Sequence, residues 1–255
     1  MMDAVVLAGG IDKGEIAAET GITHRALLDI GGRTIIHREV AALRGATQVG
    51  NIALVAPAPV QAAVTDDAVD FRVESTDSFV ENIALGVDAT APGTDQVLVI
   101  TGDLPFVTSA ALNDFVQQSV ASRADVAYSI VPRESAERQF PGGRRTYARL
   151  REGTFTGGNA VTLTRDVVRR QRDLIEHLYA ARKNPLRLAS VLGFSFIISL
   201  LAHRLSLPQL EAKASRVVGA RVAAIITSYA EIGFDVDKLS DLYLARRVVE
   251  SFDAS

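Results

Sequence analysis

The chain has 255 residues, of which 48% are hydrophobic, and its formal net charge is −3. This length allows one large α/β domain or two small ones, and the small charge argues against nucleic acid as a partner. The sequence contains no cysteine, which excludes disulfides, thiolate nucleophiles and cysteine-bound zinc. The N-terminus enters an apolar run without a signal-peptide pattern, so we expect a cytoplasmic protein.

The first predicted strand ends in a pair of glycines. Residues 4–7 are an unbroken apolar run, typical of a strand that is buried on both faces of a parallel sheet. Gly9 and Gly10 follow, so the backbone can turn sharply and approach a ligand closely. Ligands of open α/β sheets bind outside the carboxyl ends of the strands, where this loop is expected.

Strands and helices alternate over the first half of the chain. The pattern predicts helices at 34–43, 79–87 and 109–122, the second capped by Asp77 or Ser78, and strands at 51–56, 71–74, 97–100 and 125–131. This alternation favours an α/β fold with a doubly wound, mostly parallel sheet. The strand at 97–100 leads into Gly102 and Asp103, and a strand-end carboxylate near a glycine loop suggests a nucleotide with its metal ion. The alternative role for Asp103 is to cap the helix after Pro105.

The alternation ends after Pro132. A polar stretch, 133–145, is followed by a hairpin pattern near Gly153, and the sequence Gly157-Gly-Asn159 leads into a strand at 160–163. Residues 166–214 are predicted to be helical, with breaks at Asn184-Pro185 and Leu207-Pro208. A strand is predicted at 221–227 and a helix at 238–251. We therefore expect a single domain, 1–255, with a nucleotide-binding half (1–132), an inserted helical acceptor-side region (133–220), and a returning strand with the last helix (221–255).

One apolar segment, 188–201, requires a membrane check. A spanning helix needs about 20 apolar residues, and this run is shorter and contains serines and a glycine. No membrane span is expected. A buried helix is the first interpretation, and a homodimer contact or an interfacial helix are the alternatives.

Five motifs in order carry a family resemblance. They are Leu7-Ala-Gly-Gly10, Arg25-Ala-Leu-Leu-Asp-Ile-Gly-Gly-Arg33, Gly102-Asp-Leu-Pro105, Gly157-Gly-Asn159 and Asp235-Val-Asp-Lys-Leu-Ser-Asp-Leu242. The series resembles the MobA-like NTP transferase family, which is related to molybdenum-cofactor and sugar-1-phosphate nucleotidyltransferases. The resemblance implies a Rossmann-like GT-A fold and an enzyme that moves an NMP group from an NTP to a small phosphorylated acceptor, with release of pyrophosphate. It also implies Mg²⁺ or Mn²⁺ as cofactor.

The resemblance assigns expected roles to residues of this chain. Asp103 and Asp237 are the expected metal ligands, and Asp235 is the weaker candidate. Nucleotide binding is expected at Leu7, Ala8, Gly9, Gly10, Glu81, Asn82 and Gly102. The small anionic acceptor is expected at Gly157, Gly158, Asn159, Arg144 and Arg145, although the two arginines are more typical of solvated surface. Asp237 and Asp241 would alternatively charge the first turn of the last helix.

The chain departs from the family pattern in the loop after the first strand. No Arg-x-Gly follows the glycines, and Arg25 stands where relatives have a lysine. Arginine keeps the positive charge but binds phosphate in a bidentate way, and Lys13 is an alternative source of the missing cation. Lys13, Arg25 and Asp103 are thus the expected catalytic residues. The alternative function is a nucleotide-binding regulatory or scaffold protein on the same fold without efficient turnover.

Overall fold

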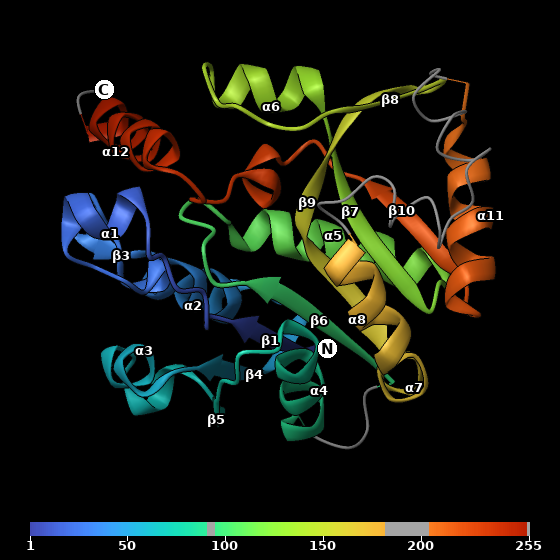
Figure 1. Cartoon of the computed structure of the whole chain (residues 1–255), viewed down its shortest axis with the longest axis horizontal. Coiled ribbons are helices and arrows are strands. Elements are labelled where there is room, and N and C mark those ends of the chain that lie inside the picture. Colours follow the sequence, from blue (N-terminus) through green and yellow to red (C-terminus); the bar gives the residue numbers. More distant parts are fainter. Residues whose placement is uncertain (91–94, 182–203, 254–255) are drawn as a thin grey trace.

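The computed structural model describes residues 1–90, 95–181 and 204–253, and these build a sheet covered by helices (Figure 1). The eight strands of the described sheet run in the order β10-β7-β9-β6-β1-β4-β5, and β8 pairs with β9. They are β1 (Met2–Leu7), β4 (Val49–Ala56), β5 (Phe71–Glu74), β6 (Gln96–Thr101), β7 (Val126–Pro132), β8 (Ala148–Leu150), β9 (Gly153–Thr164) and β10 (Val222–Ile226). A small separate sheet pairs β2 (Asp29–Ile30) with β3 (Arg33–Thr34).

The helices fall between these strands along the chain. They are α1 (Glu15–Thr20), α2 (Ile35–Gly45), α3 (Ala58–Ala63), α4 (Phe79–Ala89), α5 (Ser109–Ser122), α6 (Arg133–Gln139), α7 (Arg165–Arg170), α8 (Arg172–Ala181), α11 (Leu207–Val218) and α12 (Leu239–Asp253). The described residues also form the short 3-10 helices η1 (Arg25–Leu27), η2 (Asp66–Ala68) and η3 (Ala230–Gly233).

The sheet is mostly parallel, as predicted. Strand β1 pairs in parallel with β4 and β6, and β4–β5 and β7–β10 are also parallel. Strand β9 runs antiparallel to both of its neighbours, β6 and β7. This arrangement confirms the Rossmann-like α/β architecture with a doubly wound sheet.

The central strand β1 is apolar at nearly every position because both of its faces are covered. Val5 and Leu7 pack with Ile83 and Val87 of α4 on one face. Ala4 and Val6 belong to the cluster on the other face, which includes apolar residues of α2 and α5. The unbroken run therefore reports burial on both sides, and the side chains of each face alternate along the strand.

A third apolar cluster packs the C-terminal segment over the carboxyl ends of the strands. It joins buried residues of α1, α2, α6, η3 and α12. At its centre the Phe140 ring lies 4.3 Å from Phe234 and 5.5 Å from Phe106, measured between centroids. Figure 1 shows α12 beside α1, although these helices come from opposite ends of the chain. The last helix is thus part of the core and fixes the segment that precedes it.

Several elements differ from the sequence prediction. Gly157, Gly158 and Asn159 were expected to precede a strand, but they lie inside the 12-residue strand β9. The polar stretch after Pro132 contains helix α6, and the loop after Gly10 contains helix α1. The predicted break at Leu207-Pro208 agrees with the structure, because α11 begins there with Ser206 forming a capping box.

The predicted break at Asn184-Pro185 and the apolar segment 188–201 lie outside the described residues. Within the described ranges, no helix is long and apolar enough to cross a membrane.

Candidate active site

The ends of β1 and β6 meet at one edge of the sheet. Leu7 is paired with Thr101, and the N–H of Gly102 donates to the Leu7 carbonyl at 2.9 Å. A Cβ on Gly102 would lie 2.6 Å from the Cβ and 2.7 Å from the Cα of Ala8. Glycine is therefore required at 102 because the two strand ends approach backbone to backbone.

The glycine loop follows directly from this contact. A Cβ on Gly9 would lie 3.2 Å from the Ser75 side chain, whereas a Cβ on Gly10 would meet nothing within 4 Å. Within the described part of the chain, no hydrogen bond from the N–H groups of Gly9 and Gly10 is seen. The loop thus presents backbone donors beside open space, which suits an anionic ligand.

Arg25 is attached to the same loop by its backbone. Its N–H donates to the carbonyl of Gly10 at 3.3 Å, and Asp12 N–H donates to the Thr23 carbonyl at 2.7 Å. The chain between them is closed by a bridge of Ile11 with His24 and contains α1. The excursion from 11 to 24 therefore returns Arg25 to the mouth of the glycine loop.

The C-terminal segment brings a second carboxylate to this edge. Val236 N–H donates to the backbone carbonyl of Asp103 at 3.0 Å. Asn159 Nδ2 donates to the carbonyl of Ile232 at 3.4 Å, so strand β9 supports the same segment. These contacts place Asp237, 134 positions further along the chain than Asp103, next to the end of β6.

One guanidinium nitrogen joins the two predicted metal ligands. Arg25 Nη1 lies 2.8 Å from Asp237 Oδ1 and 3.3 Å from Asp103 Oδ2. The Asp103 side chain is 17% exposed and that of Asp237 is 52% exposed. Glycine loop, cation and carboxylates thus converge from three distant segments.

The Asp103 carboxyl is poorly satisfied by the protein. Its Oδ1 atom is buried and has no hydrogen-bond partner among the described residues. Burial, helped by repulsion from Asp235, raises the pKa of Asp103 from 3.8 to about 6, although the neighbouring Thr101 hydroxyl and the Arg25 charge oppose this shift. A buried carboxylate oxygen without a donor is uncommon in folded proteins, which makes Asp103 a candidate for a binding role.

The neighbouring carboxylate, Asp235, has its own arginine. Arg145 Nη1 lies 2.5 Å from Asp235 Oδ1, Nη2 donates to the Asp235 carbonyl at 2.9 Å, and the guanidinium stacks 4.8 Å above the Phe234 ring. Arg144 is exposed beside it. Arg145 therefore anchors the Asp235–Asp237 segment, a structural role that the sequence did not suggest.

Two buried glutamates were not expected from the sequence, and one of them holds the Asp103 loop. Glu39 of α2 is fully buried, and its Oε1 accepts a hydrogen bond from the N–H of Leu104 at 2.6 Å. Burial raises the pKa of Glu39 well above its usual value. Glu231 accepts from the Thr108 hydroxyl at 3.0 Å and from Gln139 Nε2 at 3.1 Å. The sequence does contain a signal for Glu39, because this acidic residue stands among the apolar residues of the helix predicted at 34–43.

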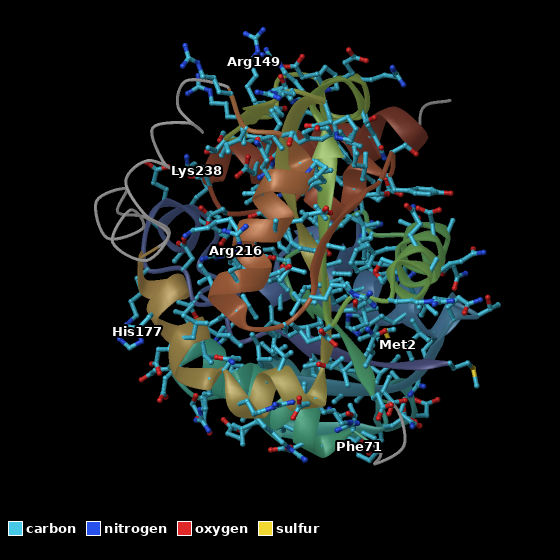
Figure 2. The ribbon with its side chains drawn as sticks, turned by 90° about the vertical axis from the view of Figure 1, so that its right-hand side faces the viewer. Met2, Phe71, Arg149, His177, Arg216 and Lys238 are labelled. Carbon is cyan, nitrogen blue, oxygen red and sulfur yellow. The ribbon has the colours of Figure 1, made fainter. Side chains whose placement is uncertain are left out.

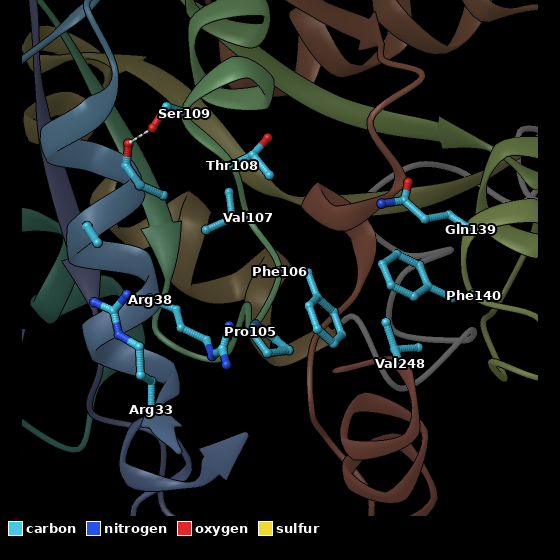
Figure 3. A pocket seen from close by; sticks show the side chains of 12 residues that line it. Arg33, Arg38, Pro105, Phe106, Val107, Thr108, Ser109, Gln139, Phe140 and Val248 are labelled. Carbon is cyan, nitrogen blue, oxygen red and sulfur yellow. Dashed lines mark hydrogen bonds between the residues drawn. The ribbon is translucent and has the colours of Figure 1, made fainter. Parts of the chain in front are cut away.

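A cavity of about 490 Å³ is lined in part by Pro105 and Phe106, which follow Asp103 in the chain (Figure 3). Arg33 and Arg38 line one wall, Phe140 and Val248 the opposite wall, and Phe106 lies between them. Beside it the Ser109 hydroxyl donates to the carbonyl of Ala42 at 2.7 Å, tying α5 to α2. None of the sequence-predicted site residues lines this cavity, so the candidate site is the open sheet edge.

The sequence profile of the MobA-like NTP transferase domain matches residues 4–228. The chain belongs to the MobA-like NTP transferase family. It is therefore a nucleotidyltransferase by family, with the glycine loop and the Asp103 loop in the matched region. A comparison with curated protein sequences found no significant match.

Solved structures of nucleotidyltransferases share this fold. A hypothetical transferase from Thermus thermophilus is 36% identical over 94% of this chain and 99% of its own, with a TM-score of 0.83. A CMP:2-keto-3-deoxy-manno-octonic acid synthetase in complex with CTP is 14% identical, with coverage of 99% and 100% and a TM-score of 0.62. A 2-C-methyl-D-erythritol 4-phosphate cytidylyltransferase, also from Thermus thermophilus, is 18% identical, with coverage of 98% of both chains and a TM-score of 0.56. The last two show likeness of fold.

The candidate site offers few protein ligands to a metal ion. It therefore suits a metal whose remaining coordination positions are filled by water and substrate. Asp103 and Asp237 converge on Arg25, and no cluster of three or more metal-binding side chains occurs within the described ranges. Magnesium is typically held by one or two carboxylates, waters and substrate phosphates. The orphaned Asp103 Oδ1 and this small oxygen donor set therefore fit Mg²⁺ or Mn²⁺.

The other predicted residues lie in different settings. Asn82 is buried, accepts from Thr76 N–H at 2.7 Å and donates to the Thr76 carbonyl at 2.9 Å, so it shapes the turn beside Gly9. Glu81 forms an ion pair with Arg172. Lys13 is exposed and has no ion pair with any residue the structure describes. The site as seen thus contains Arg25 rather than Lys13 as its cation.

Proposed function

We propose that the protein is a metal-dependent nucleotidyltransferase that moves an NMP group from an NTP to a small anionic acceptor and releases pyrophosphate. The observation that carries this proposal is the convergence of Arg25, Asp103 and Asp237 beside the glycine loop. An acceptor oxygen would form a bond to the α-phosphorus while the bond to the leaving pyrophosphate breaks. The protein's part in such a reaction is mostly positioning and electrostatic stabilisation.

The residues of the site divide this task. The N–H groups of Gly9 and Gly10 would bind phosphate oxygens, and the turn from Ser75 to Ser78, held by Asn82, would border the base. Arg25 would bind the charge of the pyrophosphate. Asp103 and Asp237 would hold Mg²⁺ or Mn²⁺, which supplies charge neutralisation on the phosphates when bound.

The acceptor would lie towards strand β9. Gly157 is exposed beside Tyr128, and Gly158 and Asn159 follow on the same strand. Burial raises the pKa of Tyr128, so its hydroxyl is a neutral donor at physiological pH. Arg144 is the exposed cation nearest in sequence to the Arg145–Asp235 pair and would contact an anionic group. The solved relatives that act on a sugar acid or a polyol phosphate support small anionic acceptors as the first class to test.

Pyrophosphate release tests this function. The protein is incubated with Mg²⁺, each of ATP, CTP, GTP and UTP, and a panel of sugar phosphates, polyol phosphates, sugar acids and pterin phosphates. We expect release with one NTP and one acceptor class, and a loss of about 100-fold or more in Asp237→Asn. Binding of an NTP without release across the whole panel would instead support a nucleotide-binding regulatory protein.

A further inference from the structure

The contact of Arg25 with the two predicted metal ligands has a consequence for how ligands bind. One nitrogen, Nη1, serves both Asp103 and Asp237, and the Arg25 side chain is 22% exposed. The Nε atom of the same guanidinium is buried and has no acceptor among the described residues. Arg25 therefore neutralises the carboxylate pair but uses its donor fork incompletely.

A divalent cation and the Arg25 guanidinium cannot both occupy this position. Mg²⁺ binds carboxylate oxygens at about 2.0–2.1 Å and prefers octahedral geometry. A cation held by the Asp103 and Asp237 carboxylates would therefore compete with Nη1, which now contacts one oxygen of each. Like charges at this separation repel strongly in a partly buried site. Metal binding between these carboxylates thus favours departure of the guanidinium.

The backbone of Arg25 gives the side chain a short path to another anion. The Arg25 N–H is bonded to the Gly10 carbonyl, and the glycine loop that it contacts carries unused N–H donors. Phosphates bound at that loop would lie within the reach of a long side chain that pivots at this point. Arginine is suited to such an exchange because its fork binds phosphate in a bidentate way.

We propose, on the basis of the proposed function, that Arg25 is a placeholder for the metal: it holds Asp103 and Asp237 in the ligand-free protein and moves to the NTP phosphates when the metal and the nucleotide bind. Because the metal alone must displace Arg25, it binds weakly without nucleotide. The NTP offers Arg25 a second anion and so raises the metal affinity. Linkage requires that the metal raises NTP affinity by the same factor.

The affinity for Mn²⁺ in the absence of nucleotide tests this directly. Free Mn²⁺ is titrated by electron paramagnetic resonance with the wild type, Arg25→Gln and Arg149→Gln. Arg149 is an exposed residue of β8 at the periphery of the molecule, so its variant removes the same charge away from the carboxylates (Figure 2). We expect Arg25→Gln to bind Mn²⁺ at least about tenfold more tightly than the wild type, and Arg149→Gln to match the wild type.

The site of the gain is checked in a double variant. Adding Asp103→Asn to Arg25→Gln is expected to remove the extra affinity. Should Arg25→Gln fail to fold, Arg25→Lys, which keeps the charge but loses the fork, is expected to give a smaller gain in the same direction.

Three results would overturn the placeholder role: equal Mn²⁺ affinity of the wild type and the folded Arg25 variants, an equal gain in Arg149→Gln, or a gain that survives Asp103→Asn. The proposed function has a separate readout, the Mg²⁺-dependent pyrophosphate release of the wild type. Release with no gain in the Arg25 variants would therefore reject only the placeholder role. Absence of both release and Mn²⁺ binding would reject the function with it.

Discussion

The Asp103 carboxyl is largely buried, although its expected role as a metal ligand requires the charged form. Its Oδ1 lacks a protein donor, and its pKa is raised from 3.8 to about 6 chiefly by burial. The folded protein therefore binds a proton at Asp103 more tightly than the unfolded chain does. Ionisation of this residue costs stability in the absence of ligand, as is common for residues selected for binding rather than folding.

This cost predicts a pH-dependent effect of Asp103→Asn. Because the folded-state pKa is the higher one, the stability of the wild type falls as pH rises between about 3.8 and 6, and the penalty is constant above that window. Without metal, Asp103→Asn is expected to be at least as stable as the wild type at pH 7 and to lose this advantage near pH 4. Urea unfolding in EDTA at both values measures this. The prediction is wrong if the stability of Asp103→Asn relative to the wild type is lower at pH 7 than at pH 4.

The two glycines at the strand ends are expected to respond oppositely to alanine. Gly102→Ala would drive a Cβ into the Ala8 backbone, and we expect a loss of about 1–3 kcal/mol in the free energy of unfolding. Gly10→Ala meets nothing within 4 Å, so its stability should stay within about 0.5 kcal/mol of the wild type.

Gly10→Ala should nevertheless weaken NTP binding by about tenfold, because its methyl group enters the space that the phosphates would occupy. Urea unfolding and equilibrium titration of each variant separate the two effects. A Gly10→Ala protein with wild-type NTP affinity would place the phosphates elsewhere.

At the scale of elements, helix α2 positions the loop that carries Asp103. Its buried Glu39 accepts from the N–H of Leu104, and burial raises the pKa of Glu39 well above its usual value. Glu39→Gln keeps a carbonyl acceptor and should change stability by less than about 1 kcal/mol at pH 7. Glu39→Ala leaves a buried N–H unsatisfied beside a cavity, and we expect a loss of about 2–4 kcal/mol.

The same pair of variants tests the role of Glu39 in the site. Glu39→Ala is expected to weaken metal-dependent NTP binding, measured by titration calorimetry, while Glu39→Gln retains it. Equal loss in both variants would mean that a negative charge at Glu39, rather than its hydrogen bond, supports the loop.

The elements that could be predicted from the sequence are those with one strong local signal. The buried run of β1 and the period of α5 gave their positions closely, and Ser78 caps α4 as expected. The Gly-Gly of β9 was assigned to a loop because glycines weaken strand propensity locally. In the structure Gly158 fits against Ser129, whose hydroxyl donates to the Ala160 carbonyl at 2.8 Å. Tertiary packing therefore outweighs the low strand propensity of these glycines.

At the scale of the whole molecule, the site depends on contacts that no sequence window contains. The convergence of Asp103 and Asp237 was expected from the family resemblance and from the common edge of the sheet. The pairing of Arg145 with Asp235 and the bridge made by Arg25 depend on side-chain geometry. The charge pattern of the sequence does not predict which carboxylates Arg25 and Arg145 contact, because these carboxylates are about 80–210 positions away in the chain.

The segment after residue 228 is predicted to be essential for folding. It lies beyond the range of the family match, yet Phe234, Val236 and Leu242 belong to the apolar cluster that closes the carboxyl edge. A chain that ends at residue 228 should lose a cooperative thermal transition, measured by circular dichroism. A chain that ends at residue 253 is the control. A wild-type transition in the shorter chain would show that this cluster is dispensable.

We expect Asp103 to hold the metal of a bound NTP, and a thermal-shift titration with a ligand-site variant measures this. The wild type and Asp103→Asn are melted with ATP, CTP, GTP or UTP, each with and without Mg²⁺. An NTP at about 100 times its dissociation constant should stabilise the wild type by about 2.7 kcal/mol. We predict that one NTP does so only with Mg²⁺ and that Asp103→Asn abolishes the effect. The same shift in wild type and variant, or no shift with any NTP, would show that Asp103 does not hold the metal of a bound NTP.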